Sequence, residues 1–150
     1  MVVTAVDISG ESLRHCRGIE NCHPVQADLG SPLPFRDRSY GMVLASLSLH
    51  YFSWRQSLRI MEEVRRVLRP GGMLLMRLNS IEDLNYGAGQ GTLLEENFYR
   101  IGDRTKRFFD ERAVTELLAD FDVRLLRHTS IDRYEQTKKV WEAWAISGMP

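Results

Sequence analysis

Short apolar runs alternate with amphipathic segments along most of this chain. The apolar runs have the length and the continuous hydrophobic character that strands of a buried parallel sheet show. They lie at residues 2–6, 23–27, 40–47 and 73–78. Segments that begin at Ser9, Ser53 and Asp110 instead repeat their apolar residues at helix spacing, and each of these three residues is a favourable helix N-cap. The alternation predicts parallel strands joined by helices.

Each predicted helix has one apolar face. The helix after Ser9 is expected to bury Leu13, Cys16 and Ile19. The corresponding sets are Leu58, Met61, Val64 and Leu68 after Ser53, and Val114, Leu117, Leu118 and Phe121 after Asp110. Charged residues lie opposite these faces, so the helices are expected to cover a sheet.

Two long strand-like runs close the chain, at residues 123–133 and 138–147. Because only the polar residues 134–137 join them, the two runs are expected to pair antiparallel. The long segment 79–107 has no clear period and is expected to be irregular, and connections of that length are usually functional or disordered. The pattern predicts an α/β three-layer sandwich with a mostly parallel sheet and a C-terminal antiparallel hairpin.

Composition excludes several classes of partner. The 150 residues suit one domain, and 20 basic against 20 acidic residues give a net charge of +0, which offers no attraction for nucleic acid or a membrane. The local pairs Arg65-Arg66 and Lys138-Lys139 are interpreted as solvated faces. The chain has no signal-peptide pattern and no membrane-spanning stretch. With only two cysteines, it is expected to be cytoplasmic.

The cysteines and two of the histidines form a palindrome that resembles a metal motif. His15-Cys16 and Cys22-His23 give the spacing HC-x5-CH, whereas metal ligands usually come as C-x2-4-C or H-x3-5-H. The sequence therefore predicts no metal site, and Cys16 is interpreted as a core thiol.

Four motifs, in their order and spacing, resemble the small-molecule "type 11" group of class I S-adenosylmethionine-dependent methyltransferases. They are VVTAVDIS (2–9), VQADLGSPLPF (25–35), SYGMVLASLSLHYF (39–52) and VLRPGGMLLM (67–76). Residues 122–134 and 138–147 resemble the family's final hairpin. The resemblance implies a Rossmann-like fold, S-adenosyl-L-methionine as cofactor, and methyl transfer to a small-molecule acceptor.

The resemblance also implies a set of cofactor-binding residues. Asp7 would hold the ribose hydroxyls and Ile8 would pack on the adenine, while Asp28 would accept a hydrogen bond from the adenine amino group. Leu29 would offer its backbone amide, and Ser46 and Leu47 would border the cofactor where a strand ends. Two simpler interpretations stay open: an acid after a strand can cap the next helix, and an acid before Gly30 can form a turn.

The acceptor side is expected near residues 50–54 and within residues 79–107. His50 could orient the acceptor or act as a base, although such a histidine is more often a packing residue. The aromatic residues Tyr51, Tyr86, Phe98 and Tyr99 are candidates to line an acceptor pocket, and structural roles for them stay open.

One part of the family pattern is missing from this sequence. The family's first strand and its E/D-x-G-x-G-x-G turn would precede Asp7, where only residues 1–6 stand. Residues 87–91 (GAGQG) fit the glycine spacing, but no strand precedes them. The chain is therefore expected to be a single, N-terminally incomplete methyltransferase-like domain, 1–150, with its first strand missing and its methyl transfer impaired.

The missing strand keeps other functions open. A non-catalytic Rossmann-like module that binds a partner is the main alternative. A nicotinamide-dependent oxidoreductase would share the use of Asp7. Without the first strand, strand edges would be left unpaired, and self-association through them is expected.

Overall fold

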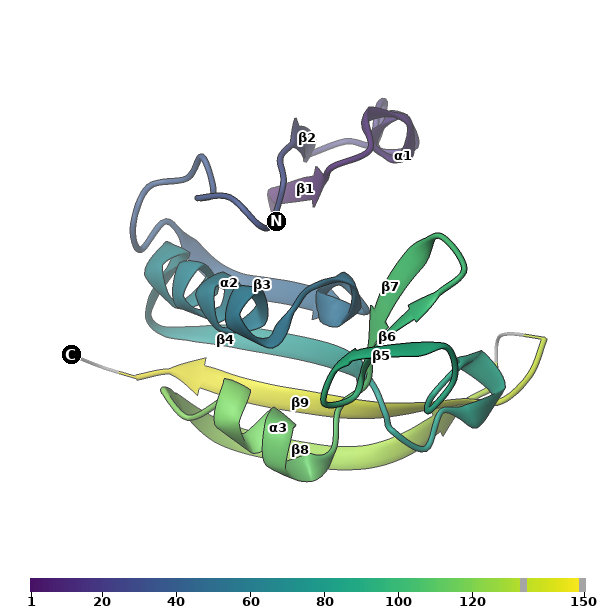
Figure 1. Cartoon of the computed structure of the whole chain (residues 1–150). Helices are drawn as coiled ribbons and strands as arrows, with labels where there is room; N and C mark the ends of the chain where they lie inside the picture. The colour runs from purple at the N-terminus through teal and green to yellow at the C-terminus, as the bar shows by residue number, and fades with distance from the viewer. Residues whose placement is uncertain (133–134, 149–150) are drawn as a thin grey trace. The chain divides into compact units, whose positions relative to one another are not determined.

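The computed structural model describes residues 1–132 and 135–148, and the chain divides into two compact units, Met1–Phe35 and Arg36–Pro150. Figure 1 shows the elements of each unit. Among the described residues, no helix is both long and apolar enough to cross a lipid bilayer.

The first unit is a strand, a short helix and a second strand. Strand β1 (Val3–Asp7) pairs in parallel with β2 (Cys22–Gln26), and Asp7 lies opposite Gln26. Helix α1 (Gly10–Arg14) lies between them, and its N-cap Ser9 accepts a hydrogen bond from the Ser12 amide. The predicted parallel strands joined by a helix are confirmed for this unit.

The predicted length of the first helix is wrong. Helix α1 ends at Arg14, so Cys16 and Ile19 follow it in turns, where Cys16 is half-buried and Ile19 is exposed. Gly18 and Asn21 adopt positive φ angles, which reverse the chain toward β2 and leave no room for another helical turn.

The second unit is built on a four-stranded sheet in the order β3-β4-β9-β8. Strand β3 (Tyr40–Ser46) pairs in parallel with β4 (Leu68–Asn79), which confirms the prediction that residues 41–46 and 73–78 are adjacent parallel strands. Between them lie η1 (Leu49–Tyr51) and helix α2 (Trp54–Val67). Ser53 caps α2 through a capping box with Gln56, as its sequence predicts.

The closing hairpin is confirmed as antiparallel. Strand β8 (Phe121–Ile131) pairs with β9 (Lys138–Ser147), and β9 also pairs antiparallel with β4, so this sheet is mixed. Arg133 and Tyr134, which the sequence places at the end of the first run and in the turn, lie outside the described residues.

Helices cover one face of this sheet. Figure 1 shows α2 and α3 (Glu111–Leu117, capped by Asp110) on the same side of it. The core lies beneath them and includes Leu74, Met76, Leu78, Val114 and Phe109. The predicted apolar faces are confirmed at Met61, Val64, Val114 and Leu117. Leu68, Leu118 and Phe121 are also buried, but they lie just after the helices because the chain turns directly into β4 and β8.

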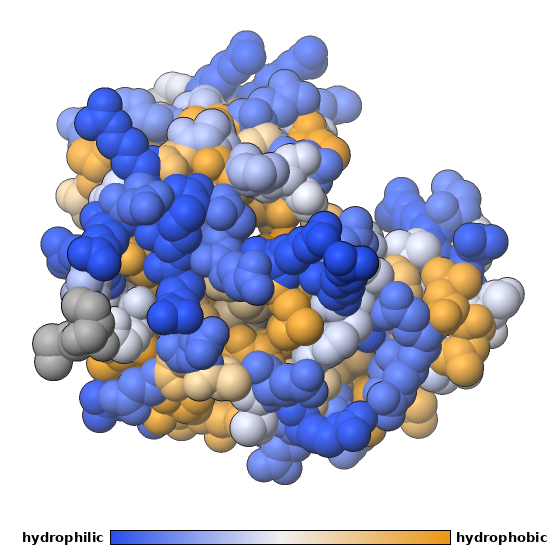
Figure 2. All heavy atoms as spheres, turned by 60° about the vertical axis from the view of Figure 1, so that its left-hand side comes forward, coloured by the Kyte–Doolittle hydropathy of each residue, from blue (hydrophilic) through white to orange (hydrophobic). Residues whose placement is uncertain are grey.

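The other sheet face leaves apolar side chains at the surface. Leu44 lies in register with Leu75, Trp144 and Leu125 across the four strands. Leu44 is 70% exposed, and Trp144 and Leu125 are also exposed. Figure 2 shows hydrophobic side chains at the surface among hydrophilic ones on the side in view. Monomeric proteins rarely expose large contiguous apolar patches, so this row is a candidate contact surface.

The expectation of an irregular segment 79–107 is wrong. It contains η2 (Leu84–Tyr86) and a three-stranded antiparallel sheet. The strands are β5 (Thr92–Glu95), β6 (Phe98–Ile101) and β7 (Arg104–Arg107). Asn97 and Gly102, both with positive φ, lie in the tight turns between them. Strands of four residues carry too little periodicity to be recognised from sequence.

The glycine-rich residues 87–91 serve the turn that leads into this small sheet. Gly87, Gly89 and Gly91 all have positive φ. A Cβ on Gly91 would lie 2.2 Å from the carbonyl oxygen of Arg100, so only glycine fits there. The structure thus explains this G-x-G-x-G spacing without a ligand.

Candidate functional site

In the first unit, the two acids predicted to bind adenosine lie where adjacent parallel strands end. Asp7 closes β1, and the Ala27 amide donates to its carbonyl oxygen at 3.1 Å. Asp28 follows β2 by two residues. Ligands bind beyond the carboxyl ends of strands in open α/β sheets, so both carboxylates stand where that geometry requires them.

Both carboxylates also form local turns. Asp7 Oδ1 accepts from the Ser9 amide at 2.7 Å, and Asp28 Oδ1 accepts from the Gly30 amide at 2.8 Å. The simpler interpretations are therefore correct for one oxygen of each acid: Asp7 Oδ1 binds at the start of the next helix, and Asp28 Oδ1 forms a turn with Gly30. No described residue donates a hydrogen bond to the Oδ2 atoms, which can still accept from a ligand.

An apolar surface accompanies these acids. The Ile8 side chain is 65% exposed directly after Asp7, and the Gln26 amide donates to the Ile8 carbonyl at 2.9 Å. Leu29 is half-buried beside Asp28. An exposed isoleucine next to an acceptor carboxylate suits a ligand with a flat apolar ring and hydroxyl donors.

In the second unit, Ser46 and Leu47 leave the carboxyl end of β3 through a strained turn. Leu47 has a φ of 56°, a conformation uncommon for a non-glycine residue, and its amide donates to the Arg77 carbonyl at 2.8 Å. Ser46 is exposed. The turn directs the chain into η1, which contains His50 and Tyr51.

His50 is half-buried in η1. Burial, and after it the positive charges of Lys106 and Lys138, lower the pKa of His50 from 6.5 to about 4, and a hydrogen bond with the Leu47 backbone opposes this shift only in part. A histidine with that pKa is neutral at pH 7 and is a weak proton acceptor. The lowered pKa therefore favours a neutral imidazole over a general base at His50.

Near His50 lies a cluster of two lysines, one carboxylate and two aromatic rings, which we call the lysine cluster: Asp83, Tyr86, Lys106, Phe108 and Lys138. Lys138 Nζ donates to Asp83 Oδ2 at 2.8 Å, and the two side chains are only 7% and 0% exposed. The Tyr86 ring lies under both ammonium groups, 4.4 Å from Lys138 Nζ and 5.7 Å from Lys106 Nζ.

Lys106 differs from Lys138 in its partners. Its Nζ donates to the Tyr86 carbonyl at 2.7 Å and lies 5.3 Å from the centre of the Phe108 ring, but no described carboxylate forms an ion pair with it. Burial and the neighbouring Lys138 charge lower the pKa of Lys106, and Asp83 raises it only in part. The two ammonium groups thus share one carboxylate.

The four predicted acceptor-side aromatics do not lie together, and strand alternation separates the neighbours Phe98 and Tyr99. Tyr99 lies opposite Lys106 in the β6–β7 ladder and packs edge-on to Phe108, so it joins the lysine cluster together with Tyr86. Tyr51 packs on His50 and is exposed. Phe98 points to the other face of the small sheet, where it lies under the guanidinium of Arg107.

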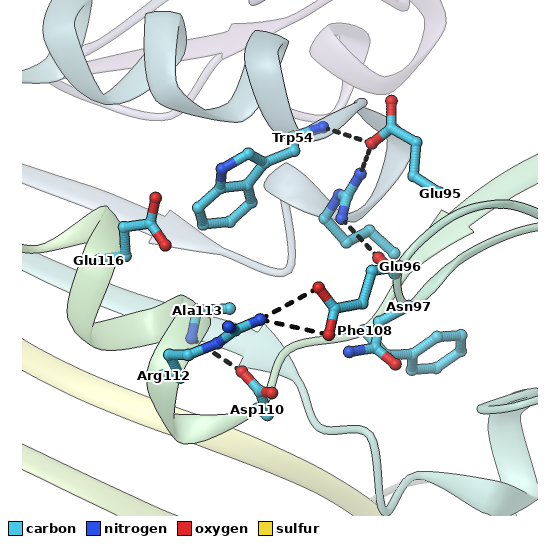
Figure 3. A pocket seen from close by; sticks show the side chains of 10 residues that line it. Trp54, Glu95, Glu96, Asn97, Phe108, Asp110, Arg112, Ala113 and Glu116 are labelled. Atoms are coloured by element: carbon cyan, nitrogen blue, oxygen red, sulfur yellow. Dashed lines mark hydrogen bonds and ion pairs between the residues drawn. The ribbon is translucent and has the colours of Figure 1, made fainter.

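That other face borders a pocket of about 210 Å³, drawn in Figure 3. Trp54, Arg107 and Phe108 form part of its wall. Trp54 and Arg107 fall within the ranges expected for the acceptor side, 50–54 and 79–107, but none of the individually predicted site residues lines the pocket. Glu95 accepts from the Trp54 amide and pairs with Arg107, while Arg112 pairs with Glu96. Because both arginines of the pocket already pair with carboxylates, their charges are explained by contacts within the protein and do not indicate a ligand.

Sequence reasoning missed the lysine cluster. The interpretation of Lys138 and Lys139 as a solvated pair is wrong for Lys138, because this side chain is buried against Asp83. The available signal was strand alternation: Lys138 and Val140 share the inward face of β9. Among the described residues, no group of three or more His, Cys, Asp and Glu side chains is arranged to hold a metal ion.

Comparison with known proteins places these elements in a family. A family model described as "Methyltransferase domain" matches residues 1–76, just over half of the chain. The chain belongs to this methyltransferase family. Residues 1–76 contain Asp7 and Asp28, the turn at Leu47 and His50. The family's cofactor is S-adenosyl-L-methionine, so the predicted family, Rossmann-like fold and cofactor class are confirmed.

The methyltransferase relatives are distant in sequence. The chain is 34% identical over 73 residues to the ubiquinone/menaquinone biosynthesis C-methyltransferase UbiE of Blochmanniella floridana. The aligned residues make up 49% of this chain and 28% of that protein. A methyltransferase of Methanosarcina mazei superposes with a TM-score of 0.83 at 19% identity, over 99% of this chain and 83% of its own. The 1,6-didemethyltoxoflavin-N1-methyltransferase of Burkholderia thailandensis gives 0.70 at 19% identity, over 97% and 61%. These structures show a shared fold.

Proposed function

We propose that this chain takes part in S-adenosylmethionine-dependent methylation of a small molecule. The observation that carries the proposal is the placement of Asp7 and Asp28 where β1 and β2 end, each with one oxygen outside its local turn. The Burkholderia structure, which contains 1,6-didemethyltoxoflavin and S-adenosylhomocysteine, supports a small-molecule acceptor for this fold.

The residues of the first unit fit the adenosine half of the cofactor. Asp7 Oδ2 can accept from ribose hydroxyls, Asp28 Oδ2 can accept from the adenine amino group, and the exposed Ile8 side chain can pack on the ring. Leu29 offers its amide. When bound, the cofactor supplies an already activated methyl group. The chain's own residues need therefore only position the reactants and exclude water.

The second unit supplies the acceptor side in this proposal. Ser46 and Leu47 border the cofactor, His50 orients the acceptor as a neutral imidazole, and Tyr51, Tyr86 and Tyr99 provide aromatic contacts. Phe98 has a structural role in this proposal: it packs against the guanidinium of Arg107 on the opposite face of the small sheet. We further propose that residues 1–150 act as one methyltransferase-like domain. Without the family's glycine-rich turn, this chain would bind the cofactor weakly and transfer methyl groups poorly.

Replacing Asp7 with alanine tests the cofactor part of the proposal. The change removes charge-assisted hydrogen bonds and is expected to weaken binding of S-adenosylhomocysteine by about 1–3 kcal/mol, measured by calorimetric titration. Glu11→Ala, an exposed acid in α1, is the matched control and should leave the affinity unchanged. Equal affinities for wild type and Asp7→Ala would count against the proposed role.

A second candidate function, a module that binds a partner or a second copy of itself, is favoured by strand β3. It is an edge strand of the four-stranded sheet: it pairs with β4, and no described strand pairs with its other side. Leu44, in the middle of β3, is 70% exposed. Exposed apolar edge strands template pairing with other chains.

The purified chain is therefore expected to associate, and Leu44→Lys should reduce the association. A lysine on an edge strand opposes pairing with another strand through charge and hydration. Light scattering should show a lower mean mass for Leu44→Lys than for wild type at equal concentration. Leu84→Lys, at an equally exposed leucine outside any strand, is the control. A monomeric wild type would contradict this prediction.

A further inference from the structure

The lysine cluster contains more positive than negative charge in a partly buried place. Lys138 and Asp83 neutralise each other at 2.8 Å, and Asp83 also accepts from the Lys139 amide at 2.9 Å through its other oxygen. Both oxygens of the carboxylate are thus occupied. The charge of Lys106 is left without a direct counterion among the described residues.

The remaining contacts of Lys106 leave donors available. An ammonium group has three N–H donors, and the hydrogen bond from Lys106 Nζ to the Tyr86 carbonyl uses one of them. The rings of Tyr86 and Phe108 stabilise the positive charge at 5.7 and 5.3 Å but accept no conventional hydrogen bond. A half-buried ammonium in this state gains from an anionic oxygen more than an exposed one does, because solvent screens it less.

The position of Lys106 links this charge to the proposed acceptor side. Strand β7 packs against η1, where Thr105 Oγ1 donates to the Tyr51 carbonyl at 3.1 Å. Lys106 is the next residue, and its charge acts on His50. Tyr99, its ladder partner, places a further aromatic ring on the same face.

We propose that Lys106 binds an anionic oxygen of the methyl acceptor, and that the acceptor is a small aromatic acid or an ionisable phenol. The half-buried Tyr99 ring, which is packed in place by the buried Phe108, complements a flat ring, and Lys106 complements its carboxylate or phenolate. The inference rests on the proposed function, because it names the substrate class of that site.

The test compares charged and neutral probes of similar shape on the full chain without cofactor. Benzoate and benzyl alcohol are titrated into ¹⁵N-labelled wild type and variants, and the amide signals of Lys106 and its neighbours are followed by NMR. Wild type should bind benzoate at least about tenfold more tightly than benzyl alcohol. Lys106→Gln should lose this preference and Lys106→Arg should keep it. Lys139→Gln, at a lysine that donates to Ser130, is the matched control and should behave as wild type.

A second arm distinguishes the two anions. The absorption of 4-nitrophenol separates phenol from phenolate, so a site for phenolate should raise the phenolate fraction at pH 6 in wild type and not in Lys106→Gln. Benzoate binding alone would restrict the substrate class to carboxylates. Equal binding of benzoate and benzyl alcohol by wild type, or unchanged benzoate binding by a folded Lys106→Gln, would overturn the proposal. If Lys106→Gln fails to fold, the comparison of benzoate with benzyl alcohol on wild type still tests whether the site prefers an anion.

The outcome is separable from the proposed function. S-adenosylhomocysteine is titrated into wild type and Lys106→Gln in parallel. Retained cofactor binding without a preference for anions would refute this inference alone. Preference for anions without any cofactor binding would refute the proposed function while leaving an anion site at Lys106.

Discussion

Replacing Asp83 with alanine is expected to lower the free energy of unfolding by about 3–5 kcal/mol. Removing the carboxylate leaves the ammonium of Lys138, only 7% exposed, without its partner at 2.8 Å, and leaves the Lys139 amide without its acceptor. Breaking a buried ion pair on one side is costly because the remaining charge stays buried. Urea denaturation followed by circular dichroism gives the change.

A matched control exists on the surface. Asp120 pairs with Arg65 at 3.2 Å, with side chains that are 70% and 56% exposed. Asp120→Ala should cost less than about 1 kcal/mol, because water screens exposed pairs. If the two alanine variants unfold at the same urea concentration, the Lys138–Asp83 pair does not stabilise the fold as described here. Asp83→Asn offers a milder change if the alanine variant does not fold.

The stability of the chain should also depend on pH through His50. In the unfolded chain His50 takes up a proton near its ordinary pKa of 6.5, whereas burial holds the folded pKa at about 4. The unfolded state therefore binds more protons between these values. The contribution is fully present above pH 6.5 and is lost as the pH falls toward 4. The loss amounts to about 3 kcal/mol.

A comparison with His50→Gln isolates this contribution from the other titrating groups. The free energy of unfolding of both proteins is measured from pH 7 to pH 4. Between pH 7 and pH 4, the free energy of unfolding of wild type should fall by about 3 kcal/mol more than that of His50→Gln. A constant difference across this range would show that His50 titrates normally in the folded protein, which would restore it as a candidate general base.

The parts of the fold that could be predicted are those with long-range periodicity. The continuous apolar runs of β3 and β4 and the capping box at Ser53 predict the parallel pair and its helix, and both are present. The short link after β8 predicts the antiparallel hairpin. The three strands of segment 79–107 could not be predicted, because their four residues each span only two alternations.

The candidate site divides in the same way. The positions of Asp7 and Asp28 after two strands could be predicted, because a strand end is visible in sequence and fixes where a carboxylate lies; their role toward the cofactor stays a prediction. Lys106 could not, because its role depends on contacts with Tyr86 and Phe108 from other elements and on Lys138, 32 positions later. Their convergence is a tertiary property that local patterns do not carry.

The central claim is that the acids after β1 and β2 form the adenosine-binding part of a methyltransferase. The most direct test is an amide NMR titration of the chain with S-adenosylhomocysteine. The account predicts saturable shifts at Asp7, Ile8, Asp28 and Leu29, with an affinity weaker than micromolar. Shifts confined to other residues, or none at millimolar ligand, would contradict the claim. Micromolar binding would contradict the role assigned to the family's glycine-rich turn.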